Sequence, residues 1–197
     1  LLSLPGSPVL YYGDEIGMAD NIWLGDRDGV RTPMQWTSDR NAGFSTANPG
    51  KLDRPVVQDP VYGYLAVNVE AQQEDRSSLL HWTRQMIQAR KRHPAFGLGS
   101  FNDLGGSNPS VLSYSREHTN EDGSVDVIVC VNNLSQFPQP VELDMRRFEG
   151  MVPVELIGGA PFPRIGELPY LLTLGGHGFY WFQLHEPATE SEEVGLL

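Results

Sequence analysis

Residues 4–18 read Leu4-Pro-Gly-Ser-Pro-Val-Leu-Tyr-Tyr-Gly-Asp-Glu-Ile-Gly-Met18. Within this stretch, residues 8–12 form a short apolar run of the strand type, which Gly13 ends before the acidic pair Asp14-Glu15. In an α/β barrel, binding and reactive groups lie on the loops that follow the strands. The stretch therefore predicts one barrel strand, with Asp14 and Glu15 at its end.

A long polar segment follows the predicted strand. From Gly17 to Pro60 the sequence is rich in Gly, Asp, Asn, Arg and Pro, with isolated aromatic residues such as Trp23, Trp36 and Phe44. No helical or alternating period persists there for more than a few residues. A loop of this length inside a compact domain is uncommon and is usually functional.

The next segment predicts a helix from about residue 76 to 92. Asp75-Arg-Ser-Ser78 offers an N-cap, and apolar residues then recur at helical spacing until Pro94. Basic residues gather near the expected C-terminal end, where the helix dipole favours them.

After Gly97-Leu-Gly99 the pattern changes to short strand-like runs separated by turn signals. The runs cover residues 111–115, 125–132, 141–143, 152–156, 170–174 and 178–184. They predict a small antiparallel β-sandwich.

The expected fold class is thus α/β plus all-β, the C-terminal end of a TIM (β/α)8 barrel followed by the sandwich. The expected domains are residues 1–96 for the barrel end, with its eighth strand, long loop and last helix, and 97–187 for the sandwich. Residues 188–197 are expected to be a flexible acidic tail.

Composition excludes several partners. The formal net charge is -11, from 14 Lys and Arg against 25 Asp and Glu, so a non-specific grip on nucleic acid phosphates is not expected. No run approaches the roughly 18 apolar residues of a membrane-spanning helix. The chain begins without Met inside an apolar run, as a fragment would.

The single cysteine, Cys130, lies in the apolar run of residues 125–131, so no intrachain disulfide can form. We interpret it as a small buried hydrophobe. A reducing compartment suits such a chain, and we expect a cytoplasmic location.

The acidic pair Asp14-Glu15 invites assignment as a catalytic acid and nucleophile. Neighbours on an extended chain point to opposite faces, however, whereas retaining glycoside hydrolysis needs two carboxyl groups about 5 to 5.5 Å apart on one bond. We therefore expect both carboxylates to hydrogen-bond to the backbone.

A metal site is not expected. His177 is interpreted as a turn residue, and His81 and Trp82 are interpreted as packing residues.

Four segments carry a family resemblance. They are residues 4–18, Gly25-Asp-Arg-Asp-Gly-Val-Arg-Thr-Pro-Met-Gln-Trp36, Asp39-Arg-Asn-Ala-Gly-Phe44 and Val67-Asn-Val-Glu-Ala-Gln72. Together they resemble glycoside hydrolase family 13, in the branch of the trehalose synthases, oligo-1,6-glucosidases and sucrose isomerases. The run of residues 21–29 is more similar to the trehalose synthases.

The resemblance implies a retaining enzyme whose three catalytic carboxylates follow the fourth, fifth and seventh barrel strands. Because this chain begins after the seventh strand, it is expected to hold no catalytic residue. Arg31 is the best candidate for substrate binding, since the corresponding Arg of relatives helps to close the pocket for the non-reducing glucose by pairing with an acid far upstream. A loop-bracing ion pair is the alternative. Gln35 is able to hydrogen-bond sugar hydroxyls, and Trp36 is able to stack on a pyranose face. The alternative for each is that it packs the loop on the barrel. The isolated aromatics suit a sugar-lined cleft as well as a core, and lone aromatics are more often core residues; they are Tyr11, Tyr12, Trp23 and Phe44.

The implied activity is interconversion of maltose and trehalose by retaining intramolecular glucosyl transfer, with glucose held in a closed site. The implied partners are maltose, trehalose, glucose and the missing N-terminal part of the barrel. Formation of a homo-oligomer is left undecided. No cofactor is expected in this chain, although calcium ligands can lie upstream in relatives. The alternatives are an oligo-1,6-glucosidase or other α-glucosidase, a sucrose isomerase, and a non-catalytic carbohydrate-associated module. The chain alone is expected to be inactive and to aggregate or fold only in its β domain.

Overall fold

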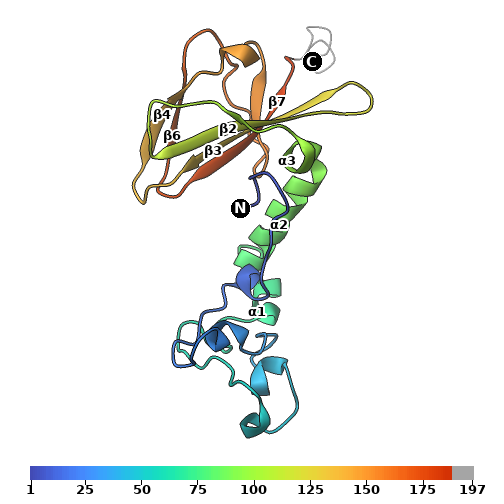
Figure 1. The fold of residues 1–197 in the computed structure, drawn as a ribbon, viewed down its shortest axis with the longest axis vertical. Helices are drawn as coiled ribbons and strands as arrows, with labels where there is room; N and C mark the ends of the chain where they lie inside the picture. Colours follow the sequence, from blue (N-terminus) through green and yellow to red (C-terminus); the bar gives the residue numbers. More distant parts are fainter. Residues whose placement is uncertain (188–197) are drawn as a thin grey trace, which may run out of the picture. The chain divides into compact units, whose positions relative to one another are not determined.

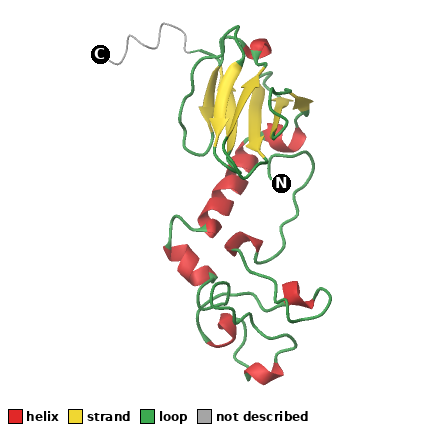
Figure 2. Cartoon of the chain, turned by 90° about the vertical axis from the view of Figure 1, so that its left-hand side faces the viewer, coloured by secondary structure: helices red, strands yellow, loops and turns green. Residues whose placement is uncertain are grey.

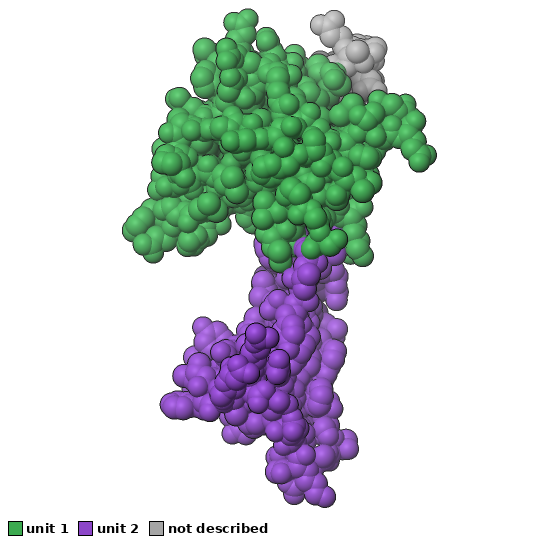
Figure 3. Space-filling model, viewed as in Figure 1, with its two compact units in different colours: residues 1–7, 88–197 green, residues 8–87 purple. Residues whose placement is uncertain are grey.

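The computed structural model describes residues 1–187, so the expected acidic tail at 188–197 lies outside the described residues. The chain forms two compact units, which Figure 3 colours separately. One unit comprises residues 8–87, and the other joins residues 1–7 to the part of the chain from residue 88 onward. Within the described residues, no helix is long and apolar enough to span a membrane.

The β unit is a sandwich of two antiparallel sheets, as the sequence predicts (Figures 1 and 2). A five-stranded open sheet has the order β1-β2-β3-β7-β5, and a two-stranded sheet pairs β4 with β6. The strands are β1 Asn102–Asp103, β2 Val111–Thr119, β3 Val125–Asn133, β4 Gln139–Leu143, β5 Val152–Glu155, β6 Tyr170–Leu174 and β7 Phe179–His185. All six predicted strand-like runs are confirmed, and only the short edge strand β1 was not anticipated.

The core explains why these segments pair. Side chains of β3 alternate between the two faces of the central sheet, and its run from Val127 to Val131 is buried throughout because both faces are covered. Inward side chains of β3, β4, β6 and β7 form one apolar cluster between the sheets, including Val129, Leu143, Leu174 and Phe182. Burial of such side chains is the main stabilising contribution to the sandwich.

The other face of the five-stranded sheet is covered by the N-terminal segment 1–7 and by the short helix α3, Pro94–Leu98. Phe96 of α3 packs on Trp181, with ring centroids 4.8 Å apart. Cys130 is fully buried on this face, as predicted, and burial raises the pKa of its thiol to about 12. The fully buried Arg116 donates to the backbone carbonyls of Ser3, Gly99 and Ser100.

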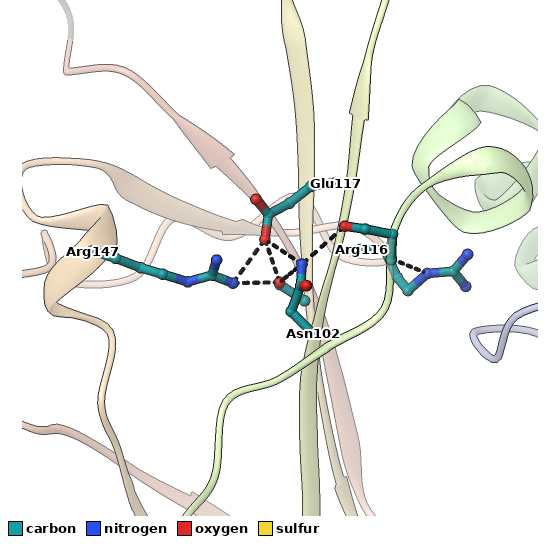
Figure 4. A network of polar contacts seen from close by, with 6 residues as sticks. Asn102, Arg116, Glu117 and Arg147 are labelled. Atoms are coloured by element: carbon teal, nitrogen blue, oxygen red, sulfur yellow. Dashed lines mark hydrogen bonds and ion pairs between the residues drawn. The ribbon is translucent and has the colours of Figure 1, made fainter.

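A polar network links the sheet edge to the 3₁₀ turn Arg146–Phe148 (Figure 4). The guanidinium of Arg147 donates to the carboxylate of Glu117 at 2.7 Å and to the hydroxyl of Ser115 at 2.6 Å. Asn102 of β1 donates to the same Glu117 oxygen at 3.0 Å. One carboxylate therefore holds the edge strand and the connection between β4 and β5 against β2.

The unit of residues 8–87 consists mainly of loops and 3₁₀ turns. Its turns are η1 Asp14–Ile16, η2 Asp28–Arg31, η3 Arg40–Gly43 and η4 Pro49–Lys51, and its helices are α1 Val69–Glu74 and the first part of α2 Leu79–Arg92. The irregular segment 17–60 contains neither α-helix nor strand, as its pattern predicts. The predicted helix at 76–92 is α2, which begins later because Ser78 accepts a hydrogen bond from the amide of His81 and acts as its N-cap.

The strand predicted at residues 8–12 is absent from the structure, and this prediction was wrong. The apolar pattern is present, but the side chain of Val9 is 83% exposed and no described segment pairs with it. A parallel barrel strand is defined by backbone hydrogen bonds to a neighbour on each side, which its own sequence does not supply.

Candidate functional site

The unit of residues 8–87 holds a cavity of about 550 Å³. Most of its lining is apolar, with charged groups at a few positions, which is typical of small-molecule sites. The lining residues are Tyr12, Glu15, Arg31, Thr32, Pro33, Met34, Trp36, Phe44, Leu52, Asp53 and Arg54. Two of the three predicted binding residues, Arg31 and Trp36, therefore line one cavity.

Aromatic side chains form much of the wall. Trp36 is 47% exposed and Phe44 is 53% exposed, so both present ring faces that can stack on a pyranose. The hydroxyl of Tyr12 donates to the carbonyl of Thr32 at 2.8 Å, and burial raises the pKa of Tyr12 above its ordinary value. The core positions favoured for the isolated aromatics were wrong. Tyr12 and Phe44 are cavity residues, and Tyr11 and Trp23 are exposed, because residues 8–87 contain no strand that could form a sheet over them.

The charged part of the cavity comes from Arg31 in η2, from Asp53 and Arg54 after η4, and from Glu15 in η1. Arg31 closes the turn η2, and its Nη1 lies 3.6 Å from Oδ1 of Asp28 in the same turn. Arg54, which follows η4, donates from Nη2 to that same oxygen at 2.8 Å. It also pairs through Nη1 with Asp53, and the hydrogen bond to Asp28 raises the pKa of Arg54 further.

Gln35 lies in the interior and does not line the cavity. Its side chain is fully buried, and its amide nitrogen donates to the carbonyls of Tyr62, at 3.2 Å, and of Val67. Its backbone carbonyl also accepts from the amide of Val69 at 2.9 Å. The structure therefore places Gln35 as a brace between the Arg31–Trp36 string and the segment that leads into α1.

Trp36 is held from both sides by backbone hydrogen bonds. Its amide donates to the carbonyl of Ala42 at 2.9 Å, and its carbonyl accepts from the amide of Glu70 at 3.0 Å. Asn41 and Ala42 have positive φ values of 55° and 60°, which allow the tight turn that returns the chain to Trp36. Asn41 stabilises that turn through its amide, which donates to the carbonyls of Ser45 and Ala47, each at 2.8 Å.

Asp14 and Glu15 accept hydrogen bonds from nearby backbone amides, as expected. Asp14 accepts a hydrogen bond from the amide of Tyr11 at 2.9 Å, and Glu15 accepts one from the amide of Gly13 at 2.8 Å. Glu15 also lines the cavity. Among the described residues, no group of three or more His, Cys, Asp or Glu could hold a metal ion. His177 lies in the turn before β7, with a φ of 53°.

Comparisons with known proteins agree with this architecture. The family model for the alpha-amylase catalytic domain matches residues 1–99, and the model for the C-terminal domain of maltogenic amylase matches residues 103–181. The chain belongs to the alpha-amylase family. The resemblance to glycoside hydrolase family 13 is thereby confirmed, and the cavity lies in the part of the chain that matches the catalytic domain of the family.

Relatives in the alpha-amylase family refine the comparison. The chain is 74% identical over 194 residues to a trehalose synthase of Pimelobacter sp., covering 98% of this chain and 34% of the relative. It is 70% identical over 184 residues to the trehalose synthase/amylase TreS of Mycobacterium tuberculosis, covering 93% and 30%. A solved variant of the trehalulose synthase MutB in complex with Tris is 25% identical, with a TM-score of 0.67, covering 92% of this chain and 36% of that one. The chain thus spans about a third of the length of the curated relatives it matches.

Sequence reasoning missed Asp28 and Arg54 as parts of the site. Asp28 had a usable signal, because an acid three residues before Arg31 can reach it across one helical turn. The contact between Asp28 and Arg54, 26 positions apart, had no such signal, since irregular backbone has no period from which a contact can be predicted.

Proposed function

We propose that this chain is part of an enzyme that interconverts maltose and trehalose by retaining intramolecular glucosyl transfer. The observation that carries the proposal is the cavity that brings Arg31 and Trp36 together, in a chain 74% identical to a trehalose synthase over nearly its whole length. The relatives named for glucosidase activity are far less similar, for example 26% identical for an oligo-1,6-glucosidase.

In this proposal the chain binds and encloses the sugar, and the rest of the enzyme supplies the reacting carboxylates. Within this chain, Glu15 accepts a hydrogen bond from the backbone of its own turn, and Asp53 pairs with Arg54. Trp36 and Phe44 supply stacking faces, while the Arg31 guanidinium supplies charged donors for a hydroxyl or carboxylate. The reaction breaks the glycosidic bond of maltose, keeps the glucosyl group on an enzyme carboxylate, and transfers it to the 1-hydroxyl of the retained glucose.

Exclusion of water distinguishes this reaction from hydrolysis. The glucosyl intermediate is attacked by whichever hydroxyl is held next to it, so a closed site favours the captive glucose over water. The irregular segment 17–60, which contributes most of the cavity wall, is our candidate for that closure. The single buried Cys130 suits a reducing compartment, and we propose the cytoplasm.

The test uses the complete gene product, incubated with maltose and analysed for trehalose and glucose. Trehalose as the main product supports the proposal, whereas glucose as the main product assigns the protein to the glucosidases. Absence of turnover together with weak maltose binding assigns it to a non-catalytic module. Arg31→Ala is expected to lower turnover at least tenfold while the circular dichroism spectrum is unchanged. The matched control is Arg40→Ala, an exposed arginine of the same segment that does not line the cavity.

A further inference from the structure

Asp28 is shared unequally between two arginines of the cavity. Its Oδ1 accepts a hydrogen bond of 2.8 Å from Nη2 of Arg54, whereas Nη1 of Arg31 lies 3.6 Å from the same atom. Normal N–H···O hydrogen bonds span about 2.7 to 3.2 Å, so only the contact with Arg54 is one. The carboxylate is therefore held by the arginine 26 residues away and not by the one in its own turn.

Both terminal nitrogens of the Arg54 guanidinium bind carboxylates of the protein. Nη2 binds Asp28 and Nη1 binds Asp53, while Nε is buried and has no partner within residues 1–187. The side chain of Arg31 is 46% exposed, and its one recorded ion pair is the long contact with Asp28. Of the two guanidinium groups in the cavity wall, that of Arg31 is the more exposed and makes the weaker contact with Asp28 within residues 1–187.

We propose that Arg54 is a positioning residue that keeps Asp28 away from Arg31 and so leaves the Arg31 guanidinium available for the sugar. This inference rests on the proposed function. Asp28 and Arg31 begin and end the same 3₁₀ turn, so without Arg54 the carboxylate is close enough to move the few tenths of an ångström to hydrogen-bonding distance of Arg31. A charge-assisted pair within the turn would then have to break each time a sugar binds.

The inference predicts that a second substitution, at Asp28, restores the activity lost with Arg54. No such restoration is expected if Arg54 binds the sugar itself or only stabilises the fold. Arg54→Ala is expected to raise the KM for maltose of the complete gene product roughly two- to fivefold, the strength of a partly exposed ion pair, with a smaller effect on kcat. Adding Asp28→Asn to Arg54→Ala removes the competing carboxylate and is expected to restore the KM of the unsubstituted enzyme. Arg54→Lys keeps a cation beside Asp28 and is expected to leave KM within twofold.

The matched control is Lys51→Ala, which removes a cation from the adjacent turn η4 without touching the cavity. If Arg54→Ala proves insoluble, Arg54→Gln, alone and with Asp28→Asn, takes its place in the comparison. A KM that stays raised in the Arg54→Ala/Asp28→Asn enzyme overturns the inference, as does an unchanged KM in Arg54→Ala. If the unsubstituted enzyme converts maltose to neither trehalose nor glucose, it is the proposed function that fails, and the two failures are thereby distinguished.

Discussion

The guanidinium of Arg116 donates a hydrogen bond of 3.1 Å to the backbone carbonyl of Ser3, 113 residues earlier in the chain. The same side chain donates to the carbonyls of Gly99 and Ser100, at 3.0 and 2.8 Å. Next to it, the hydroxyl of Tyr114 donates to the hydroxyl of Ser3 at 2.6 Å. Two neighbouring positions on one face of β2 therefore bind the N-terminal segment to the sheet.

Arg116→Met is expected to destabilise the β unit strongly. Methionine keeps most of the buried volume, but three backbone carbonyls lose charge-assisted donors, a loss on the order of 3 to 5 kcal/mol. Urea unfolding followed by circular dichroism measures the change. The exposed Arg164→Met is the matched control and is expected to stay within about 0.5 kcal/mol. Equal stabilities of the two variants would contradict the assigned role of Arg116.

Acid is expected to weaken the contact between α3 and the sheet through Asp126. Burial raises the pKa of this carboxyl, but hydrogen bonds from His93, the Ala95 amide and Gln183 outweigh it, so its pKa lies below the ordinary value of 3.8. A depressed pKa in the folded state contributes stability that is fully present above the unfolded pKa and lost as the pH falls through the folded pKa.

The comparison of Asp126→Asn with the unsubstituted protein isolates this effect. The difference in unfolding free energy is expected to be largest near pH 7 and to shrink steadily below about pH 4. Glu121→Gln, an exposed carboxylate on the β2–β3 turn, serves as the control and is expected to leave the pH profile unchanged. A pH-independent difference between the Asp126 variants would show that the charge of Asp126 contributes nothing.

Cys130 is expected to resist alkylation until the β unit unfolds. Its pKa of about 12, against an ordinary 9.0, lowers the thiolate fraction about 1,000-fold at a given pH, and its side chain is fully buried. Because it is the only cysteine, iodoacetamide labelling followed by intact mass reports on this one site. Labelling at pH 8 should be slow in buffer and rapid in concentrated urea. Rapid labelling under native conditions would mean that the face between the sheet and α3 opens readily.

The β unit was predictable because its signals are local. Alternating apolar runs such as residues 170–174 and turn signals such as Gly175-Gly176 encode strands and their ends within a few residues, and the helix at 79–92 carries its own cap. The strand at 8–12 failed for the opposite reason, since its hydrogen-bonding partners are not part of its own sequence. The contacts of Arg116 with residues 3, 99 and 100 were equally out of reach of any periodicity.

The candidate site likewise has a part that could be predicted from the sequence and a part that could not. The Arg31–Trp36 string was identified through a family resemblance, and the structure brings Arg31 and Trp36 to one cavity. Gln35 is the one residue of the string that does not line the cavity, however, and side-chain chemistry alone does not say which way a given residue faces. Gln35 can hydrogen-bond a sugar or a backbone carbonyl with equal ease, and only the fold puts the carbonyls of Tyr62 and Val67 beside it.

Gln35→Leu is therefore expected to act on stability and not on sugar contacts. Leucine fills much of the buried volume but leaves the carbonyls of Tyr62 and Val67 without their side-chain donor, which costs about 1 to 3 kcal/mol. The thermal midpoint of the complete gene product should fall by several degrees, while the KM for maltose at a temperature well below that midpoint changes less than twofold. Gln58→Leu, an exposed glutamine of the same segment, is the control and should change neither quantity. A raised KM with an unchanged thermal midpoint would instead assign the Gln35 amide to the bound sugar, because a ligand contact lowers affinity without destabilising the free enzyme.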